Sequence, residues 1–115
     1  MDQSTFQQFV LSDTVIVIHT ERMLDNNNAH IMAEQLSEAR KKGLKFAIID
    51  MEKLDFLSSA GVGSILGSIE DFREMGGDIV ICNASTTILH IFKVLDLGDY
   101  LKVMNTQEEA IKSCK

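Results

Sequence analysis

The chain has 115 residues, of which 45% are hydrophobic and 24% charged, and its formal net charge is −6. This length fits one domain with its own core, residues 1–115, and the acidic balance disfavours binding to the phosphates of nucleic acid. Residues 1–9 lack the basic start and apolar stretch of a signal peptide, and no apolar run reaches the roughly 20 residues that span a membrane, so we expect a cytoplasmic protein without a membrane span.

The first part of the chain predicts a β-hairpin followed by a helix. Thr5–Leu11 and the β-branched run Val15–His19 are two strands joined by a polar turn. Asp25–Asn28 then offers several residues that favour the start of a helix, and apolar residues recur at helical spacing after it. The basic residues and glycine of Arg40–Gly43 predict its end.

The remaining chain alternates short apolar strands with helices. Phe46–Ile49, Ile79–Cys82 and Leu101–Met104 are typical of buried strands. Helix starts are predicted at Ser58-Ser59, at Ser85, and at Thr106, where Glu109 three residues later completes a capping box. The order ββαβαβαβα predicts an α/β fold: a single domain with a mixed, mostly parallel sheet of about five strands and four helices.

Three polar loops are expected where the parallel strands end, which is the edge where open α/β sheets bind ligands and partners. These loops are Asp25–Asn28, Leu54–Ser59 and Asn83–Ser85. We expect the acidic residues near this edge to be solvated loop charges rather than a magnesium site; they are Asp25, Asp50, Glu52 and Asp55.

The serine pair Ser58-Ser59 opens a helix that contains Gly61, Gly63 and Gly67. Each glycine inside a helix costs about 1 kcal/mol relative to alanine, so three of them require a reason. Close packing of the helix on the sheet is one explanation for Gly63 and Gly67. Because most serines at helix starts only cap the helix, sequence chemistry alone leaves a phosphorylatable serine as a possibility.

Catalytic and cofactor sites are disfavoured by what the chain lacks. Leu66 occupies the position of the third glycine in a dinucleotide-binding GxGxxG pattern, and no GxSxG sequence or histidine in the edge loops supports a serine hydrolase. Asp50 lacks the acidic pair that a response-regulator receiver requires. Cys82 is expected to be a buried small hydrophobe, and its distance from Cys114 fits no metal-ligand spacing. We therefore expect no catalytic residue, no metal and no cofactor.

Residues 54–66 read LDFLSSAGVGSIL, which resembles the signature of the STAS-domain anti-sigma factor antagonists. Three further segments resemble other elements of that family in the same order: Met23-Leu24-Asp25 followed by Ala29, Gly76–Cys82, and Phe92–Tyr100. The likeness covers nearly the whole chain.

The resemblance implies a non-enzymatic switch. In this family, the unphosphorylated antagonist binds an anti-sigma factor that is also a serine/threonine kinase, is released when the kinase phosphorylates one serine, and is reset by a serine phosphatase. Matched residue by residue, the acceptor is Ser59, with Ser58 at the position usually held by Asp as the second choice. Arg22 replaces the glycine of the upstream element.

The partner-binding residues that follow are Asp25, Asn26, Asn27, Asn28, Ser58, Ser59, Ala60 and Gly61. The alternative function is that of a STAS adapter or scaffold subunit in a signalling or transport assembly, without a phosphorylation cycle.

Overall fold

A five-stranded sheet forms the centre of the protein, for which a computed structural model describes residues 5–115; residues 1–4 of the predicted domain lie outside this range. The strand order is β1-β2-β4-β6-β7, with β1 antiparallel to β2 and all other neighbours parallel. The strands are β1 (Gln7–Val10), β2 (Val15–His19), β4 (Phe46–Asp50), β6 (Asp78–Cys82) and β7 (Lys102–Met104). The predicted hairpin and mostly parallel sheet are confirmed, although the first strand is shorter than Thr5–Leu11.

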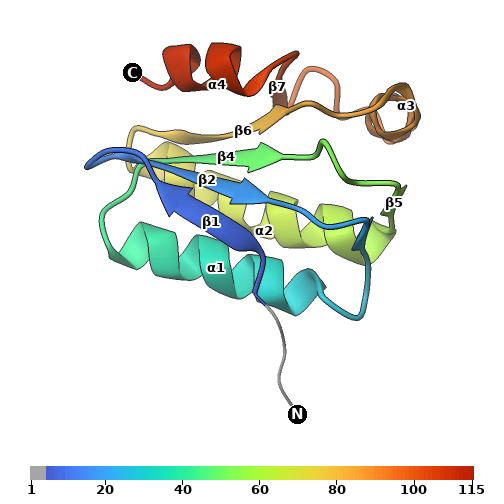
Figure 1. Ribbon diagram of the computed structural model, residues 1–115, viewed down its shortest axis with the longest axis horizontal. Helices are drawn as coiled ribbons and strands as arrows, with labels where there is room; N and C mark the ends of the chain where they lie inside the picture. Colours follow the sequence, from blue (N-terminus) through green and yellow to red (C-terminus); the bar gives the residue numbers. More distant parts are fainter. Residues whose placement is uncertain (1–4) are drawn as a thin grey trace.

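Four helices surround the sheet, as the sequence predicted. They are α1 (Ala29–Lys41), α2 (Ser59–Glu74), α3 (Thr86–Val94) and α4 (Gln107–Ser113). Helices α1 and α2 cover one face of the sheet and α4 lies on the other face, while α3 lies at the end of the molecule that also carries β5 (Figure 1). Within residues 5–115, no helix is both long and apolar enough to cross a membrane.

The central strands are buried on both sides, which explains their continuous apolar sequence. On the face covered by α1 and α2, Ile18 and Ile49 join the larger core, which includes Phe72 of α2. On the opposite face, Ile48 and Val80 join a smaller core with Ala110 of α4. The two cores fix α1, α2 and α4 to the sheet.

A second, two-stranded sheet was not predicted. It consists of β3 (Met23–Leu24) and β5 (Phe56–Leu57), which run parallel to each other. Strands of two residues are too short for the alternation of apolar and polar residues to reveal them. This small sheet decides where the candidate site forms. Strand β3 leads directly into the predicted loop Asp25–Asn28, whereas β5 lies inside the segment Leu54–Ser59 that was predicted to be a loop, and leads into the serine pair.

The predicted helix starts are confirmed at three positions. The side chains of Ser58, Ser85 and Thr106 each accept a hydrogen bond from the backbone N–H three residues further on. After α1, Gly43 adopts a φ of +87°, a left-handed conformation that glycine takes at little cost. In contrast, Asn28 precedes α1 without capping it through its side chain.

Candidate partner-binding site

Strands β3 and β5 bring the loop Asp25–Asn28 beside the first turn of α2. The backbone N–H of Ser58 donates to the carbonyl oxygen of Leu24 at 3.0 Å. Gly61 is buried against the same carbonyl group, and a Cβ at this position would overlap the Leu24 oxygen. Only glycine lets the two backbones approach so closely, so Gly61 holds the loop and the helix start together.

The loop Asp25–Asn28 is fixed by its own hydrogen bonds. The Asp25 carboxylate accepts from the N–H of Asn27 at 2.9 Å, and the Asp25 N–H donates to Oδ1 of Asn28 at 2.9 Å. Asn28 also donates through Nδ2 to the carbonyl of Met23 at 2.9 Å. Asp25 is buried, whereas Asn26 and Asn27 are exposed. Asp25 therefore shapes the loop, and the two asparagines form its outer surface.

The two serines differ in what their hydroxyl groups do. Ser58 is half-buried, and its Oγ accepts a hydrogen bond from the N–H of Gly61 at 3.2 Å. Ser59 is the first residue of α2 and is exposed, as is Ala60. Among residues 5–115, no group hydrogen-bonds to the Ser59 hydroxyl; the hydrogen bonds at the helix start are made by Ser58 and Gly61. One hydroxyl is thus used for the fold and its neighbour faces solvent.

Close packing does not explain the other two glycines of α2. A Cβ at Gly63 or Gly67 would meet no atom within 4 Å, and both residues are exposed. The packing explanation is therefore wrong for these positions and holds for Gly61 instead. Gly63 and Gly67 leave the outer side of α2 without projecting side chains next to Ser59.

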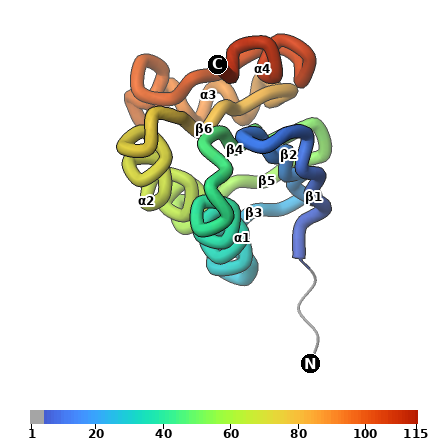
Figure 2. The backbone as a smooth tube through the Cα atoms, turned by 90° about the vertical axis from the view of Figure 1, so that its left-hand side faces the viewer, coloured from blue at the N-terminus to red at the C-terminus, as the bar shows by residue number. Residues whose placement is uncertain are grey.

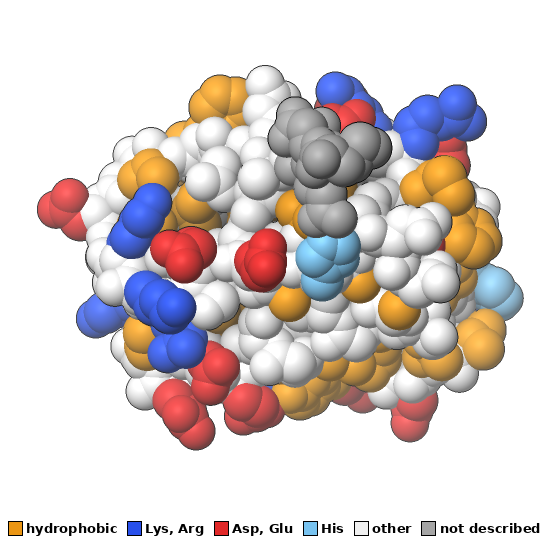
Figure 3. Space-filling view, turned by 90° about the horizontal axis from the view of Figure 1, so that it is seen from below, with side chains coloured by type: hydrophobic (Ala, Val, Ile, Leu, Met, Phe, Trp, Pro, Cys, Tyr) orange, Lys and Arg blue, Asp and Glu red, His pale blue; other side chains and the backbone are white. Residues whose placement is uncertain are grey.

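An apolar groove of about 280 Å³ adjoins the serine pair. Leu57, Ser58, Ser59 and Val62 line one wall, and His90, Ile91, Val94 and Leu95 of the α3 region line the other. Figure 3, seen from below, shows exposed hydrophobic side chains at the right, the end that carries β5 and α3 in Figure 1, and others along its lower edge. The exposed fractions of Val94 and Leu95 are 68% and 48%.

The α3 wall of this groove was not predicted from the sequence. The structure buries Ile88 and Phe92, leaves Ile91 half-buried and exposes Leu95. The sequence did hold a signal for this exposure. Val94 and Leu95 are adjacent apolar residues at the helix end, and two adjacent residues cannot both lie on the narrow stripe of a helix that faces the core.

At the end of the main sheet, Asp50 is buried rather than solvated. Its carboxylate accepts from Nδ2 of Asn83 at 3.1 Å, from Nε2 of Gln107 at 2.9 Å and from the N–H of Glu52 at 3.0 Å. His19 Nδ1 lies 3.8 Å from the same carboxylate. The expectation of solvated charges is thus wrong for Asp50 and Asp25, because both carboxylates are buried and accept hydrogen bonds from groups inside the protein. Glu52 and Asp55 are exposed as expected.

Asn83 therefore belongs to the Asp50 cluster, at the end of the five-stranded sheet, while the other two polar loops meet at the small sheet. Cys82 is buried as predicted. Its burial, and secondarily the nearby Asp50 carboxylate, raises the pKa of the thiol to about 12. Across residues 5–115, no three His, Cys, Asp or Glu side chains are grouped so that they could hold a metal ion.

This small α/β domain brings together a serine at an exposed helix start, a hydrogen-bonded polar loop and an apolar groove. The chain belongs to the STAS domain family, whose sequence pattern it matches over residues 8–110. The predicted family and fold are confirmed.

Two relatives have names that bear on function. The chain is 29% identical over 107 residues to an anti-sigma F factor antagonist of Lysinibacillus sphaericus, covering 92% of this chain and 91% of the relative. It is similar in structure to the anti-sigma factor antagonist SpoIIAA in its unphosphorylated form, with a TM-score of 0.76, 28% identity, and 95% and 96% of the two chains covered. For the phosphorylated form of SpoIIAA from Bacillus, the TM-score is 0.74 at 28% identity, with 95% and 98% covered.

Proposed function

We propose that this protein is an anti-sigma factor antagonist whose binding to its partner is controlled by phosphorylation of Ser59. Its relatives of matching length are anti-sigma factor antagonists, and the similar protein SpoIIAA exists in phosphorylated and unphosphorylated forms. One observation carries the choice of residue: the hydroxyl of Ser58 caps α2, whereas that of Ser59 is exposed and accepts no bond from residues 5–115.

In this proposal, the unphosphorylated protein binds an anti-sigma factor that is also a serine/threonine kinase, in the cytoplasm. The binding surface comprises the loop Asp25–Asn28, residues 58–61 and the exposed side of α2. The protein contributes no catalysis of its own; it presents Ser59 to the kinase, and a serine phosphatase later removes the phosphate.

The charge of the phosphate explains release. A phosphoserine carries about −1.5 to −2 charges at neutral pH. Leaving such a charge uncompensated in an interface costs on the order of 3 kcal/mol, which is about a hundredfold in affinity. The positive end of the helix dipole stabilises the phosphate in the free protein as well as in the complex, so it does not restore binding. No change of fold is needed.

The groove beside Ser59 supplies the attractive part of the interface. Its lining is largely apolar, and Val94 and Leu95 are exposed there. An apolar side chain of the anti-sigma factor in this groove would provide a buried centre, which is where interfaces gain most of their affinity. The phosphate would then lie at the rim of the most desolvated part of the complex.

Incubation with the anti-sigma factor kinase of the same organism and ATP tests the proposal. Intact-mass analysis is expected to give a single added phosphate, mapped to Ser59 and lost in Ser59→Ala but retained in Ser58→Ala. Modification at Ser58 alone would show that Ser58 is the acceptor, and would leave the proposal that phosphorylation controls partner binding unchanged. No modification, together with unchanged partner binding by Ser59→Asp and Ser59→Glu, would favour the adapter or scaffold instead.

A further inference from the structure

Strand β1 is the outermost strand on its side of the sheet and has one unpaired backbone edge. It pairs only with β2 among the described strands, and it lies at the border of the molecule (Figure 2). Leu11 N–H donates to Val15 across the hairpin, so by alternation the backbone groups of Gln7 and Phe9 also face β2. Those of Gln8 and Val10 therefore point outward.

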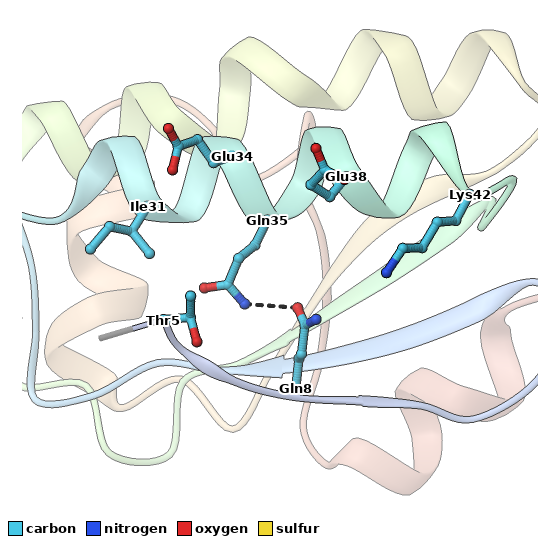
Figure 4. Close-up of a pocket in the computed structure, with 7 residues that line it drawn as sticks. All are labelled: Thr5, Gln8, Ile31, Glu34, Gln35, Glu38 and Lys42. Carbon is cyan, nitrogen blue, oxygen red and sulfur yellow. Dashed lines mark hydrogen bonds between the residues drawn. The ribbon is translucent and has the colours of Figure 1, made fainter. Parts of the chain in front are cut away.

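The start of β1 is closed off by Gln35 of α1. The Phe6 N–H donates to Oε1 of Gln35 at 2.7 Å, and Nε2 of Gln35 donates to the Phe6 carbonyl at 3.0 Å. The same Nε2 donates to Oε1 of Gln8 at 2.7 Å (Figure 4). Gln35 thus satisfies the backbone of Phe6 and holds the side chain of Gln8, so the open edge begins at the backbone of Gln8.

Among residues 5–115, this open edge lacks the usual protection against pairing. Edge strands are normally protected by charged side chains, proline or a covering element. Residues 7–11 read QQFVL and contain no charge in a chain whose net charge is −6. Three consecutive apolar residues are exposed here: Phe9 by 48%, Val10 by 59% and Leu11 by 46%.

We infer that β1 pairs with β1 of a second copy of this chain, antiparallel and about a two-fold axis. The edge is its own complement: Gln8 of one copy and Val10 of the other both present outward N–H and C=O groups, and they exchange both bonds when they stand opposite each other. This register places Phe9 opposite Phe9 of the second copy, in the closer, non-hydrogen-bonded type of pair. The two five-stranded sheets then form one continuous sheet.

A second copy fits this edge because two chains of net charge −6 repel each other least where the contacting strands are uncharged, although Glu34, Glu38 and Lys42 of α1 line the pocket beside Gln8. The neutral stretch of residues 7–11 provides such a place on both partners at once. A closed, isologous contact also pairs the open β1 edge of each copy with the other, so no third copy can add at β1. Because the contact is short, the dimer should be weak and concentration-dependent.

Sedimentation equilibrium over a wide concentration range tests the inference. The weight-average mass of the wild-type chain is expected to rise from 12.8 kDa towards twice that value. Phe9→Lys should remain monomeric, whereas Leu95→Lys, at a position equally exposed at 48%, should dimerise like the wild type. A wild-type chain that stays monomeric at millimolar concentration, or dimerisation lost in Leu95→Lys and retained in Phe9→Lys, would overturn the inference.

Cross-linking tests the register and does not depend on the Phe9→Lys variant folding. In a Cys114→Ser background, Phe9→Cys should form a covalent dimer on mild oxidation, because opposed positions of a non-hydrogen-bonded pair lie within disulfide range. Gln7→Cys should not form a covalent dimer, because in this register Gln7 stands opposite Leu11 of the second copy and lies far along the strand from the second Gln7. Equal cross-linking of the two variants, or none with Phe9→Cys, would contradict the proposed pairing.

Discussion

The backbone N–H of Ser58 is bonded to the carbonyl oxygen of Leu24 at 3.0 Å, across the two strands of the small sheet. This contact joins the end of β3 to the start of α2, and the loop Asp25–Asn28 follows directly. The candidate site is therefore built on backbone hydrogen bonding. Its geometry depends on backbone contacts and on residues such as Gly61, and the contribution of single residues to stability can be tested by substitution.

Gly61→Ala should destabilise the protein because the new methyl group would overlap the Leu24 carbonyl. We expect a loss of about 1–3 kcal/mol, the usual cost of forcing extra volume into a packed site. Gly63→Ala is the matched control on the same helix: the methyl group has open space, so replacing glycine should stabilise by up to about 1 kcal/mol. Urea unfolding measures both, and equal effects would refute the close approach at Gly61.

The two serines should contribute unequally to stability. Ser58→Ala removes the cap of α2 and should cost about 1 kcal/mol, whereas Ser59→Ala, at an exposed position with no bond within residues 5–115, should change the free energy of unfolding by less than about 0.5 kcal/mol. Ser58→Asp should recover most of the loss, since aspartate also caps helices. Chemical denaturation tests this order, and a larger loss for Ser59→Ala would contradict it.

The buried carboxylate of Asp50 should be a major structural element. Asp50→Ala would leave the half-buried amides of Asn83 and Gln107 without their partner, and because an unsatisfied buried polar group costs about 1–3 kcal/mol, we expect a total loss in that range. Glu52→Ala, two residues away but exposed, should be within about 0.5 kcal/mol of the wild type. Thermal unfolding of the two variants provides the comparison; similar melting temperatures would argue against the Asp50 cluster.

Cys82 should be chemically inert in the folded protein. Burial and the Asp50 carboxylate raise the pKa of the Cys82 thiol from its ordinary 9.0 to about 12, so the thiol stays protonated at pH 9.0. Only the thiolate reacts readily. Because the folded pKa exceeds the unfolded one, the contribution of Cys82 to stability is complete below pH 9.0 and is lost as the pH rises towards about 12. Cys82→Ala should lose less stability over that interval than the wild type.

Alkylation followed by peptide mass analysis measures the first part of this prediction. At pH 9.0, Cys82 should be modified only after denaturant is added. Rapid modification of Cys82 in the native protein would mean that the smaller core is open to solvent.

The apolar groove should contribute to partner binding without supporting the fold. Leu95→Glu places a charge among the lining residues and should weaken binding of the anti-sigma factor about ten- to a hundredfold, corresponding to about 1.4–3 kcal/mol at an interface hot spot. Leu89→Glu is the control on α3, since Leu89 is exposed by 38% but does not line the groove. Equal affinities of the two variants would place the interface elsewhere.

The sequence predicts the five-stranded sheet and its helices because strand runs such as Val15–His19 and caps such as Ser85 are local signals. It also predicts that Asp25–Asn28 and the serine pair lie close together. It does not reveal the small sheet, since Met23-Leu24 and Phe56-Leu57 carry no periodicity. The burial of Asp50 likewise depends on Gln107, a residue distant in sequence whose amide has no local reason to face an aspartate.

The roles within the serine pair illustrate the same division. The family resemblance assigns the acceptor to Ser59 by position, and the sequence alone leaves Ser58 as the second choice. The structure adds an independent physical difference, because a hydroxyl that caps a helix and one that faces solvent are distinguishable only once Gly61 has been placed against Leu24.

The central claim is that a phosphate on Ser59 abolishes partner binding, and isothermal titration with the anti-sigma factor tests it most directly. The titrations would compare the unmodified protein, the protein phosphorylated at Ser59, and Ser59→Ala. We predict tight and similar binding for the unmodified protein and Ser59→Ala, and affinity lower by about a hundredfold for the phosphorylated form. Equal affinities of the phosphorylated and unmodified forms would contradict the account.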